Sequence, residues 1–119
     1  MKELKMGLLT NKYKKVYHEE HFKYNAPHHF EVWQVDGNKG NLLGKIDFQE
    51  GAIKECGVNG VMNEDLICMV LARLESFQKC NFQCRENAIA ITKLEEALLW
   101  LRKRTIGREE RGVEGTHEI

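Results

Sequence analysis

Two stretches of the chain carry apolar residues at helical spacing, and only a short link, residues 80–84, separates them. The apolar positions are Ile67, Val70, Leu71, Leu74 and Phe77 in the first stretch, and Ile91, Leu94, Leu98 and Leu101 in the second. Each set falls along one side of an α-helix. So short a link makes the second helix fold back along the first. The sequence therefore predicts an antiparallel helical hairpin over residues 63–105, with Asn63 as the first N-cap.

A β-hairpin is predicted before the helices. Residues 29–35 alternate in side-chain character, as a half-buried strand does, and residues 42–49 place Leu43, Ile46 and Phe48 in a partner strand. Residues 36–40, rich in glycine and asparagine, have the composition of a turn. Residues 51–63 are predicted to be a loop, with a short strand considered at 52–55.

These elements predict an α+β fold, a small antiparallel β-sheet followed by a C-terminal antiparallel helical hairpin. A chain of 119 residues is expected to form a single domain. Within it we distinguish a polar N-terminal arm (1–27), a β-sheet region (28–62), the helical hairpin (63–105) and a ligand-covering tail (106–119).

The second helix carries apolar residues on two sides. Ile89 and Trp100 lie well away from the stripe that contains Leu94 and Leu98, and both sides cannot pack on the same core. An exposed face with a tryptophan is typical of a subunit interface, so we expect a homo-oligomer, either a dimer or a hexamer. The alternative is that the sheet covers this face within one chain.

Composition excludes several function classes. Eighteen basic and eighteen acidic residues give a formal net charge of zero, which argues against long DNA or RNA as a partner. No segment is long and apolar enough to predict a membrane span. The spacing of Cys80 and Cys84 does not match a zinc knuckle, so no metal or other cofactor is expected. No nucleophile or dinucleotide motif is present, and no catalytic residue is predicted.

The end of the second helix holds a cluster of basic side chains. Arg104 lies in the expected last turn, whereas Arg108 and Arg111 are predicted beyond Gly107, outside the regular helix. Guanidinium groups bind phosphate through paired hydrogen bonds, so this cluster indicates an anion site. The alternative is that nearby carboxylates neutralise the arginines; the available acids are Glu109, Glu110 and Glu114.

Phe77 and Asn87 are predicted at the other end of the hairpin. Purely structural roles would be core packing for Phe77 and helix capping for Asn87. An aromatic ring can also stack on a base, and the backbone N–H groups at the start of a helix can bind an anion. Arg104 lies about 25 Å from Asn87 by helical rise. One chain can hardly bring these groups together, but two chains with antiparallel hairpins could.

Several segments together resemble a known family. They are residues 85–101 (RENAIAITKLEEALLWL), residues 111–117 (RGVEGTH), and the upstream runs at 48–51 and 57–66. Over residues 28–117 the chain resembles a phage helical-hairpin domain that is shared by Thoeris anti-defence sponges and certain anti-CBASS sponges. The upstream segment is similar to the Thoeris branch.

The resemblance implies a non-catalytic sponge that acts in the cytoplasm of the infected bacterium. Such a protein binds cyclic ADP-ribose isomers (glycocyclic ADP-ribose) made by TIR-domain enzymes, in pockets between protomers. Carried over to this chain, Phe77 would stack on the ligand, Asn87 would form hydrogen bonds with it, and Arg104, Arg108 and Arg111 would hold the pyrophosphate. Some relatives also sequester the cyclic oligonucleotides of CBASS at a separate site, so the resemblance implies these molecules as a second ligand class for this chain.

Two other function classes compete with the sponge. The first is a protein–protein interaction module, in which the helical hairpin docks a partner and the arginines are charges at its rim. The second is a small phosphodiesterase that uses histidine or a metal. The interaction module predicts no small-molecule binding, and the enzyme predicts an altered ligand.

Overall fold

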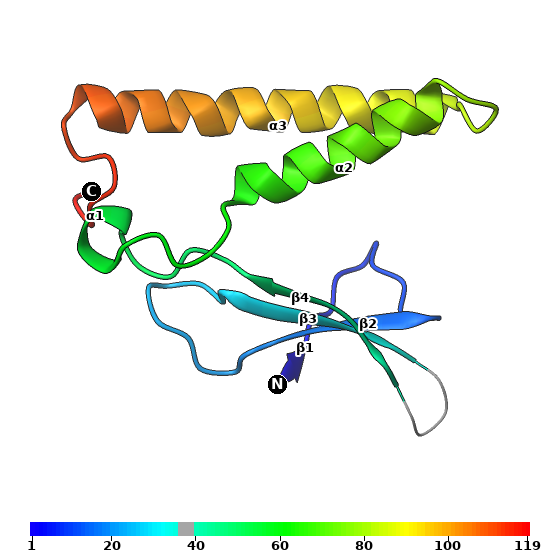
Figure 1. Ribbon diagram of the computed structural model, residues 1–119, viewed down its shortest axis with the longest axis horizontal. Helices are drawn as coiled ribbons and strands as arrows, with labels where there is room; N and C mark the ends of the chain where they lie inside the picture. Colours follow the sequence, from blue (N-terminus) through cyan, green and yellow to red (C-terminus); the bar gives the residue numbers. More distant parts are fainter. Residues whose placement is uncertain (36–39) are drawn as a thin grey trace. The chain divides into compact units, whose positions relative to one another are not determined.

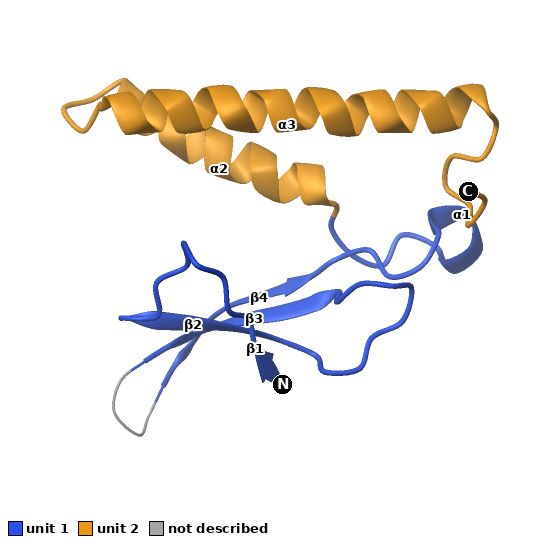
Figure 2. Cartoon of the chain, turned by 180° about the vertical axis from the view of Figure 1, so that it is seen from behind, with its two compact units in different colours: residues 1–61 blue, residues 62–119 orange. Residues whose placement is uncertain are grey.

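The computed structural model describes residues 1–35 and 40–119, and these form the predicted α+β fold (Figure 1). The chain divides into two compact units, residues 1–61 and 62–119, which Figure 2 colours separately. The first is the sheet unit, and the second is the helical unit.

The sheet unit holds four antiparallel strands in the order β1-β2-β3-β4. They are β1 (Lys2–Glu3), β2 (Lys14–His18), β3 (His29–Gln34) and β4 (Leu42–Asp47). The predicted hairpin of β3 and β4 is confirmed, with Phe30 opposite Ile46 and Val32 opposite Gly44. Residues 36–39 of the turn that we predicted at 36–40 lie outside the described residues.

The N-terminal segment contributes two strands that the sequence analysis did not assign, since residues 1–27 were predicted as a polar arm. β2 pairs with β3, placing Val16 opposite Val32 and His18 opposite Phe30. The segment KKVYH offers little apolar alternation of its own. Its pairing with the more apolar β3, the next strand along the chain, supplies the strand's hydrogen bonds and side-chain contacts.

The strand considered at residues 52–55 is wrong, because the chain forms a short helix there, α1 (Ile53–Cys56). The amide N–H of Cys56 donates to the Ala52 carbonyl at 2.7 Å, and that of Gly57 donates to the Ile53 carbonyl at 2.8 Å. Gly57 then adopts a positive φ of 75°, a conformation that glycine tolerates and that ends the turn of helix.

The helical unit consists of α2 (Asn63–Gln78) and α3 (Arg85–Glu110), which confirms the helical hairpin. Leu71 of α2 is the buried apolar residue of its core. Across the link, the Gln78 side-chain amide donates to the Cys84 carbonyl at 3.0 Å and accepts from the Cys84 N–H at 2.9 Å. This paired contact fixes the bend between the helices.

The predicted N-cap of α2 is wrong by one residue. Met62 occupies the cap position in extended backbone, and Asn63 is the first helical residue. The Asp65 carboxylate accepts a hydrogen bond from the Met62 N–H at 2.8 Å. The carboxylate at the third helical position thus satisfies the backbone N–H of the cap residue, and the Asn63 side chain is not needed for this.

The second helix is longer than predicted, because α3 continues through Gly107 to Glu110. Glycine inside a helix costs about 1 kcal/mol relative to alanine, which the surrounding good helix formers can offset. The helix ends where Gly112 takes a φ of 73° and its N–H bonds the Glu109 carbonyl at 3.0 Å. Our expectation that Arg108 lies outside the helix is therefore wrong, and Arg111 occupies the C-cap.

No helix within residues 1–35 and 40–119 combines the length and apolar character needed to cross a membrane. Because α3 has 26 residues and α2 has 16, the C-terminal part of α3 extends past α2, as both ribbon views show. One end of α3 therefore meets the bend, and the other meets the C-terminal tail.

Candidate anion-binding groove

A groove of about 680 Å³ lies on the C-terminal part of α3, and the tail forms one of its walls. We call it the α3–tail groove. Its lining residues all belong to the helical unit and are mostly basic or aromatic. They are Trp100, Lys103, Arg104, Gly107, Arg108, Arg111, His117, Glu118 and Ile119. The groove therefore brings together the three arginines that the sequence analysis predicted as phosphate ligands.

The helical repeat explains why these residues share one surface. At 100° per residue, Trp100, Arg104, Gly107 and Arg111 fall within about 60° of one another around α3. Gly107 lies in the middle of this stripe, and a β-carbon built there would meet no atom within 4 Å. The missing side chain leaves an open floor between the aromatic end of the groove and the arginine end.

The groove keeps an excess of positive charge. Four cationic side chains line it, Lys103, Arg104, Arg108 and Arg111, against the single acidic side chain of Glu118. None of the ion pairs within the described residues involves any of the three arginines.

The neutralisation that we weighed from sequence therefore does not form. The nearby Glu109 instead pairs with Arg102, outside the groove, with 3.3 Å between Arg102 Nη1 and Glu109 Oε1. A cationic groove without such pairing is suited to a phosphate-bearing ligand.

Two of the arginines also hold the tail. Arg108 Nη2 donates to the carbonyl oxygens of Val113 and Thr116, each at 3.1 Å, and Arg111 Nη1 donates to the Ile119 carbonyl at 2.9 Å. These bonds turn the tail back toward α3. A guanidinium carries five N–H donors, so each arginine retains donors for a ligand.

Arg104 differs from the other two arginines. The part of the chain that the structure describes offers its guanidinium no hydrogen-bond or ion-pair partner. All of its donors are therefore available. Among the three predicted phosphate ligands, Arg104 is the one without a hydrogen-bond partner in the described part of the chain.

Six of the lining residues were not predicted as ligand-binding groups, among them Trp100, Lys103 and His117. Trp100 lies about one helical turn before both Lys103 and Arg104, so the three side chains can meet on one side of α3. This spacing is a signal that the sequence itself offers. Lys103 Nζ lies 5.0 Å from the centre of the Trp100 ring. His117 reaches the groove only through the return of the tail, which spacing along the chain does not reveal.

Comparison with known proteins identifies the family. The model of the Acb2/Tad1 hairpin domain matches residues 42–105, which is more than half of the chain. A curated relative, Thoeris anti-defense 1 of Bacillus phage SBSphiJ7, is 52% identical over an alignment that covers 99% of each protein. The chain belongs to the Acb2/Tad1 hairpin-domain family. The resemblance inferred from sequence is confirmed.

In this Acb2/Tad1 hairpin protein, Phe77 and Asn87 lie at the bend, away from the α3–tail groove. The Phe77 ring packs edge-to-face on Phe82 with centroids 6.4 Å apart, and the Arg73 guanidinium lies 5.7 Å from its centre. Phe77 is still 39% exposed. Asn87 lies in the first turn of α3, where Cys84 rather than Asn87 is the N-cap, and the Cys84 sulfur accepts from the Asn87 N–H at 3.4 Å.

Within one chain, about 25 Å of helix separates Asn87 from Arg104. Figure 1 shows the bend and the tail at opposite ends of α3. The structure therefore brings the arginines together but does not bring Phe77 or Asn87 to them.

The sheet unit holds a second cluster of polar groups around His29. Its ring nitrogens contact Asp47 Oδ1 at 2.8 Å and Glu50 Oε2 at 2.7 Å, and Glu19 lies 4.0 Å away. The hydrogen bonds to Asp47 and Glu50 raise the pKa of His29. A carboxylate beside each ring nitrogen favours the cationic form of the ring, in which both nitrogens donate, so these residues form an ion cluster when His29 is protonated.

No group of three or more histidine, cysteine, aspartate or glutamate residues in the described chain has metal-binding geometry. All four cysteines are free and exposed. The structure therefore offers no further support for a metal centre within the residues it describes.

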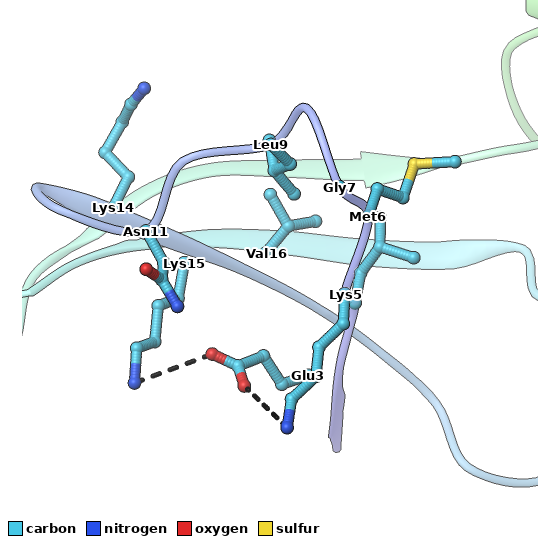
Figure 3. Close-up of a pocket in the computed structure, with 10 residues that line it drawn as sticks. Glu3, Lys5, Met6, Gly7, Leu9, Asn11, Lys14, Lys15 and Val16 are labelled. Atoms are coloured by element: carbon cyan, nitrogen blue, oxygen red, sulfur yellow. Dashed lines mark ion pairs between the residues drawn. The ribbon is translucent and has the colours of Figure 1, made fainter.

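A second hollow, of about 390 Å³, lies beside β1 and β2 in the sheet unit. Figure 3 shows the Glu3 carboxylate between the side chains of Lys5 and Lys15, at N–O distances of 4.0 and 3.5 Å. Two of the lysines in this hollow are thus already paired with an acid. The α3–tail groove, whose arginines lack such a partner, is the stronger candidate for binding a phosphorylated ligand.

Proposed function

We propose that this protein is a non-catalytic sponge that binds and sequesters cyclic ADP-ribose isomers made by TIR-domain immune enzymes, and so blocks Thoeris defence in the infected bacterium. The observation that carries the proposal is the α3–tail groove, which Arg104, Arg108 and Arg111 line and in which none of them forms an ion pair with an acidic side chain of the described residues. The name of the curated relative, Thoeris anti-defense 1, supports the anti-defence part.

The chemistry of the groove suits a pyrophosphate. Two linked phosphates present several anionic oxygens, and guanidinium forks can bind such oxygens through pairs of hydrogen bonds. Arg104 would supply unoccupied donors, whereas Arg108 and Arg111 would bind the ligand and hold the tail over it. The sponge needs tight binding without turnover, and charge-assisted hydrogen bonds in a partly closed groove are a source of that affinity.

We further propose that the complete site forms between two protomers of a homo-oligomer, a dimer or a hexamer. Phe77 and Asn87 lie about 25 Å of helix away from the arginines of their own chain. A second chain whose α3 runs antiparallel to the first would place its bend beside the first chain's groove. Phe77 would then stack on the ligand, and Asn87 would form hydrogen bonds with it.

Calorimetric titration of the full chain with purified cyclic ADP-ribose isomers tests this proposal. Arg104→Ala should weaken binding about 10- to 100-fold, because it removes charge-assisted hydrogen bonds worth about 1.5–3 kcal/mol. Arg102→Ala is the matched control, since it removes the same charge from the same helix but at a position outside the groove. Equal affinity of both variants and the unmodified protein would reject the groove as the site.

One observation favours the alternative function, an interaction module that docks another protein. Leu99 and Met69 of the helical unit are 72% and 56% exposed. Under that alternative, neither cyclic ADP-ribose isomers nor the cyclic oligonucleotides of CBASS would give a binding signal. Including a cyclic dinucleotide and a cyclic trinucleotide in the same titrations therefore distinguishes the two functions and tests the second ligand class.

A further inference from the structure

Trp100 presents a large aromatic surface beside the cationic groups of the α3–tail groove. Its side chain is 62% exposed, and it lines the groove together with Lys103 and Arg104. It lies away from the core-facing stripe of α3, so packing within the helical hairpin does not account for it. An indole next to several cations is the combination that proteins use to bind a nucleobase joined to phosphate.

We propose that Trp100 is the nucleobase-stacking wall of the groove, which makes the site specific for pyrophosphates that carry an adenine over pyrophosphates without a base. This inference rests on the proposed function and adds a specificity-determining residue to it. From the sequence, base stacking is predicted for Phe77 and a subunit interface for Trp100, so Trp100 takes a different role here.

The spacing along α3 gives the groove two chemically different ends. Trp100 precedes Arg104 by about 6 Å along the helix axis and Arg111 by about 16 Å. Gly107 lies between them and leaves the floor open. A ligand lying along this stripe would place its base on the indole and its phosphates among the arginines, without crossing another side chain.

In the free protein Lys103 occupies part of the space over the indole, with its Nζ 5.0 Å from the ring centre. An exposed cation–π contact of this kind is weaker than stacking between a base and an aromatic ring. A base can therefore displace Lys103, whose flexible side chain can swing toward the phosphates. The contact therefore does not block the site.

The test compares two variants of Trp100 and one control variant with two probes. Trp100→Phe keeps an aromatic face, Trp100→Leu keeps only apolar volume, and Leu99→Ala, at an exposed neighbour outside the groove, is the matched control. The probes are a purified glycocyclic ADP-ribose and inorganic pyrophosphate, each measured by calorimetric titration. The mass of every variant is measured by light scattering, so that a loss of assembly is seen directly.

Trp100→Leu should weaken glycocyclic ADP-ribose binding about 5- to 150-fold, the range that corresponds to removal of one stacked base. It should leave pyrophosphate binding within about threefold, because that probe has no base. Trp100→Phe should retain most of the nucleotide affinity. The ligand should also change the tryptophan fluorescence of the unmodified protein, and that change should be absent in Trp100→Phe.

Three outcomes would overturn the inference, and they differ in cause. If the unmodified protein binds neither probe, the proposed function itself fails. If it binds glycocyclic ADP-ribose and Trp100→Leu binds it equally well, the function stands and the stacking role is wrong. If the Trp100 variants lose mass and both probes together, Trp100 belongs to a subunit interface instead.

Discussion

Gly107 is the position at which stability and ligand binding should respond in opposite directions. It lies inside α3, and a β-carbon added to it would have no neighbouring atom within 4 Å outside the adjacent helix backbone, so the first carbon of a larger side chain meets no clash in the free protein. Leucine is a better helix former than glycine by about 0.6–0.8 kcal/mol. Gly107→Leu should therefore raise the melting temperature of the helical unit by about 3–5 °C.

The same leucine would fill the floor of the α3–tail groove between Trp100 and Arg111, where the ligand is proposed to lie. Binding of a cyclic ADP-ribose isomer should then fall below detection in a calorimetric titration. Gly107→Ala is the control, because it gives a similar gain in helix stability but adds a single methyl group. Melting is followed by far-ultraviolet circular dichroism.

Either of two results would refute this reasoning. A Gly107→Leu protein that binds the ligand like the unmodified chain would show that the groove is not the site. A Gly107→Leu protein that melts at a lower temperature would show that the space over the glycine is occupied in solution, for example by a neighbouring protomer.

Three further predictions concern the framework around the site. The hydrogen bonds to Asp47 and Glu50 raise the pKa of His29 in the folded protein. The stabilisation that protonated His29 provides is therefore complete below the pKa of histidine in the unfolded chain, about 6.5, and it is lost as pH rises through the higher pKa of the folded state. The denaturation midpoint of the sheet unit should therefore fall as pH rises above about 6.5, and His29→Gln should flatten that dependence; an unchanged slope would contradict it. Arg108→Gln should speed amide hydrogen exchange in residues 113–119 without loss of helix signal, since Arg108 donates to two tail carbonyls; unchanged exchange would show that other contacts hold the tail. Leu71→Ala should cost about 2–4 kcal/mol in urea denaturation of the helical unit, because Leu71 is its buried apolar residue; a cost under about 1 kcal/mol would place its core elsewhere.

The elements with strong local patterns could be predicted from the sequence. The stripe that includes Leu94 and Leu98 predicted α3, and the alternation around Val32 predicted β3. β2 could not be predicted because its lysines and histidine mask the alternation, and the ten residues that join it to β3 carry no short hairpin-turn signal. The sequence places the end of α3 too early because glycine often ends a helix, whereas here good helix formers follow Gly107 and the left-handed residue comes only at Gly112.

The clustering of the three arginines could be predicted from the sequence, whereas their role as ligand-binding residues stays a prediction. The density of arginines near the chain's C-terminal end pointed to Arg104, Arg108 and Arg111, and all three line one groove in the structure. The tail turns back toward α3 because Arg108 donates hydrogen bonds to two of its backbone carbonyls. The sequence does not show which carbonyls accept these bonds, because every residue has one.

Phe77 and Asn87 remain predictions as ligand-binding residues, as does the oligomer that would bring them to the groove. The division of the chain into one domain with a polar arm and a ligand-covering tail also stays a prediction. Each depends on how chains and units assemble, which local sequence patterns do not determine.

The most direct test of the sponge is to identify what the protein holds after exposure to its proposed ligand. Purified protein is incubated with the products of a TIR-domain cyclase, washed and heat-denatured, and the released material is identified by mass spectrometry. The account predicts release of an intact cyclic ADP-ribose isomer at a stoichiometry near one per groove, with Arg104→Ala releasing far less. Release of linear ADP-ribose would show that the protein is an enzyme, and release of nothing would contradict sequestration of this class of ligand.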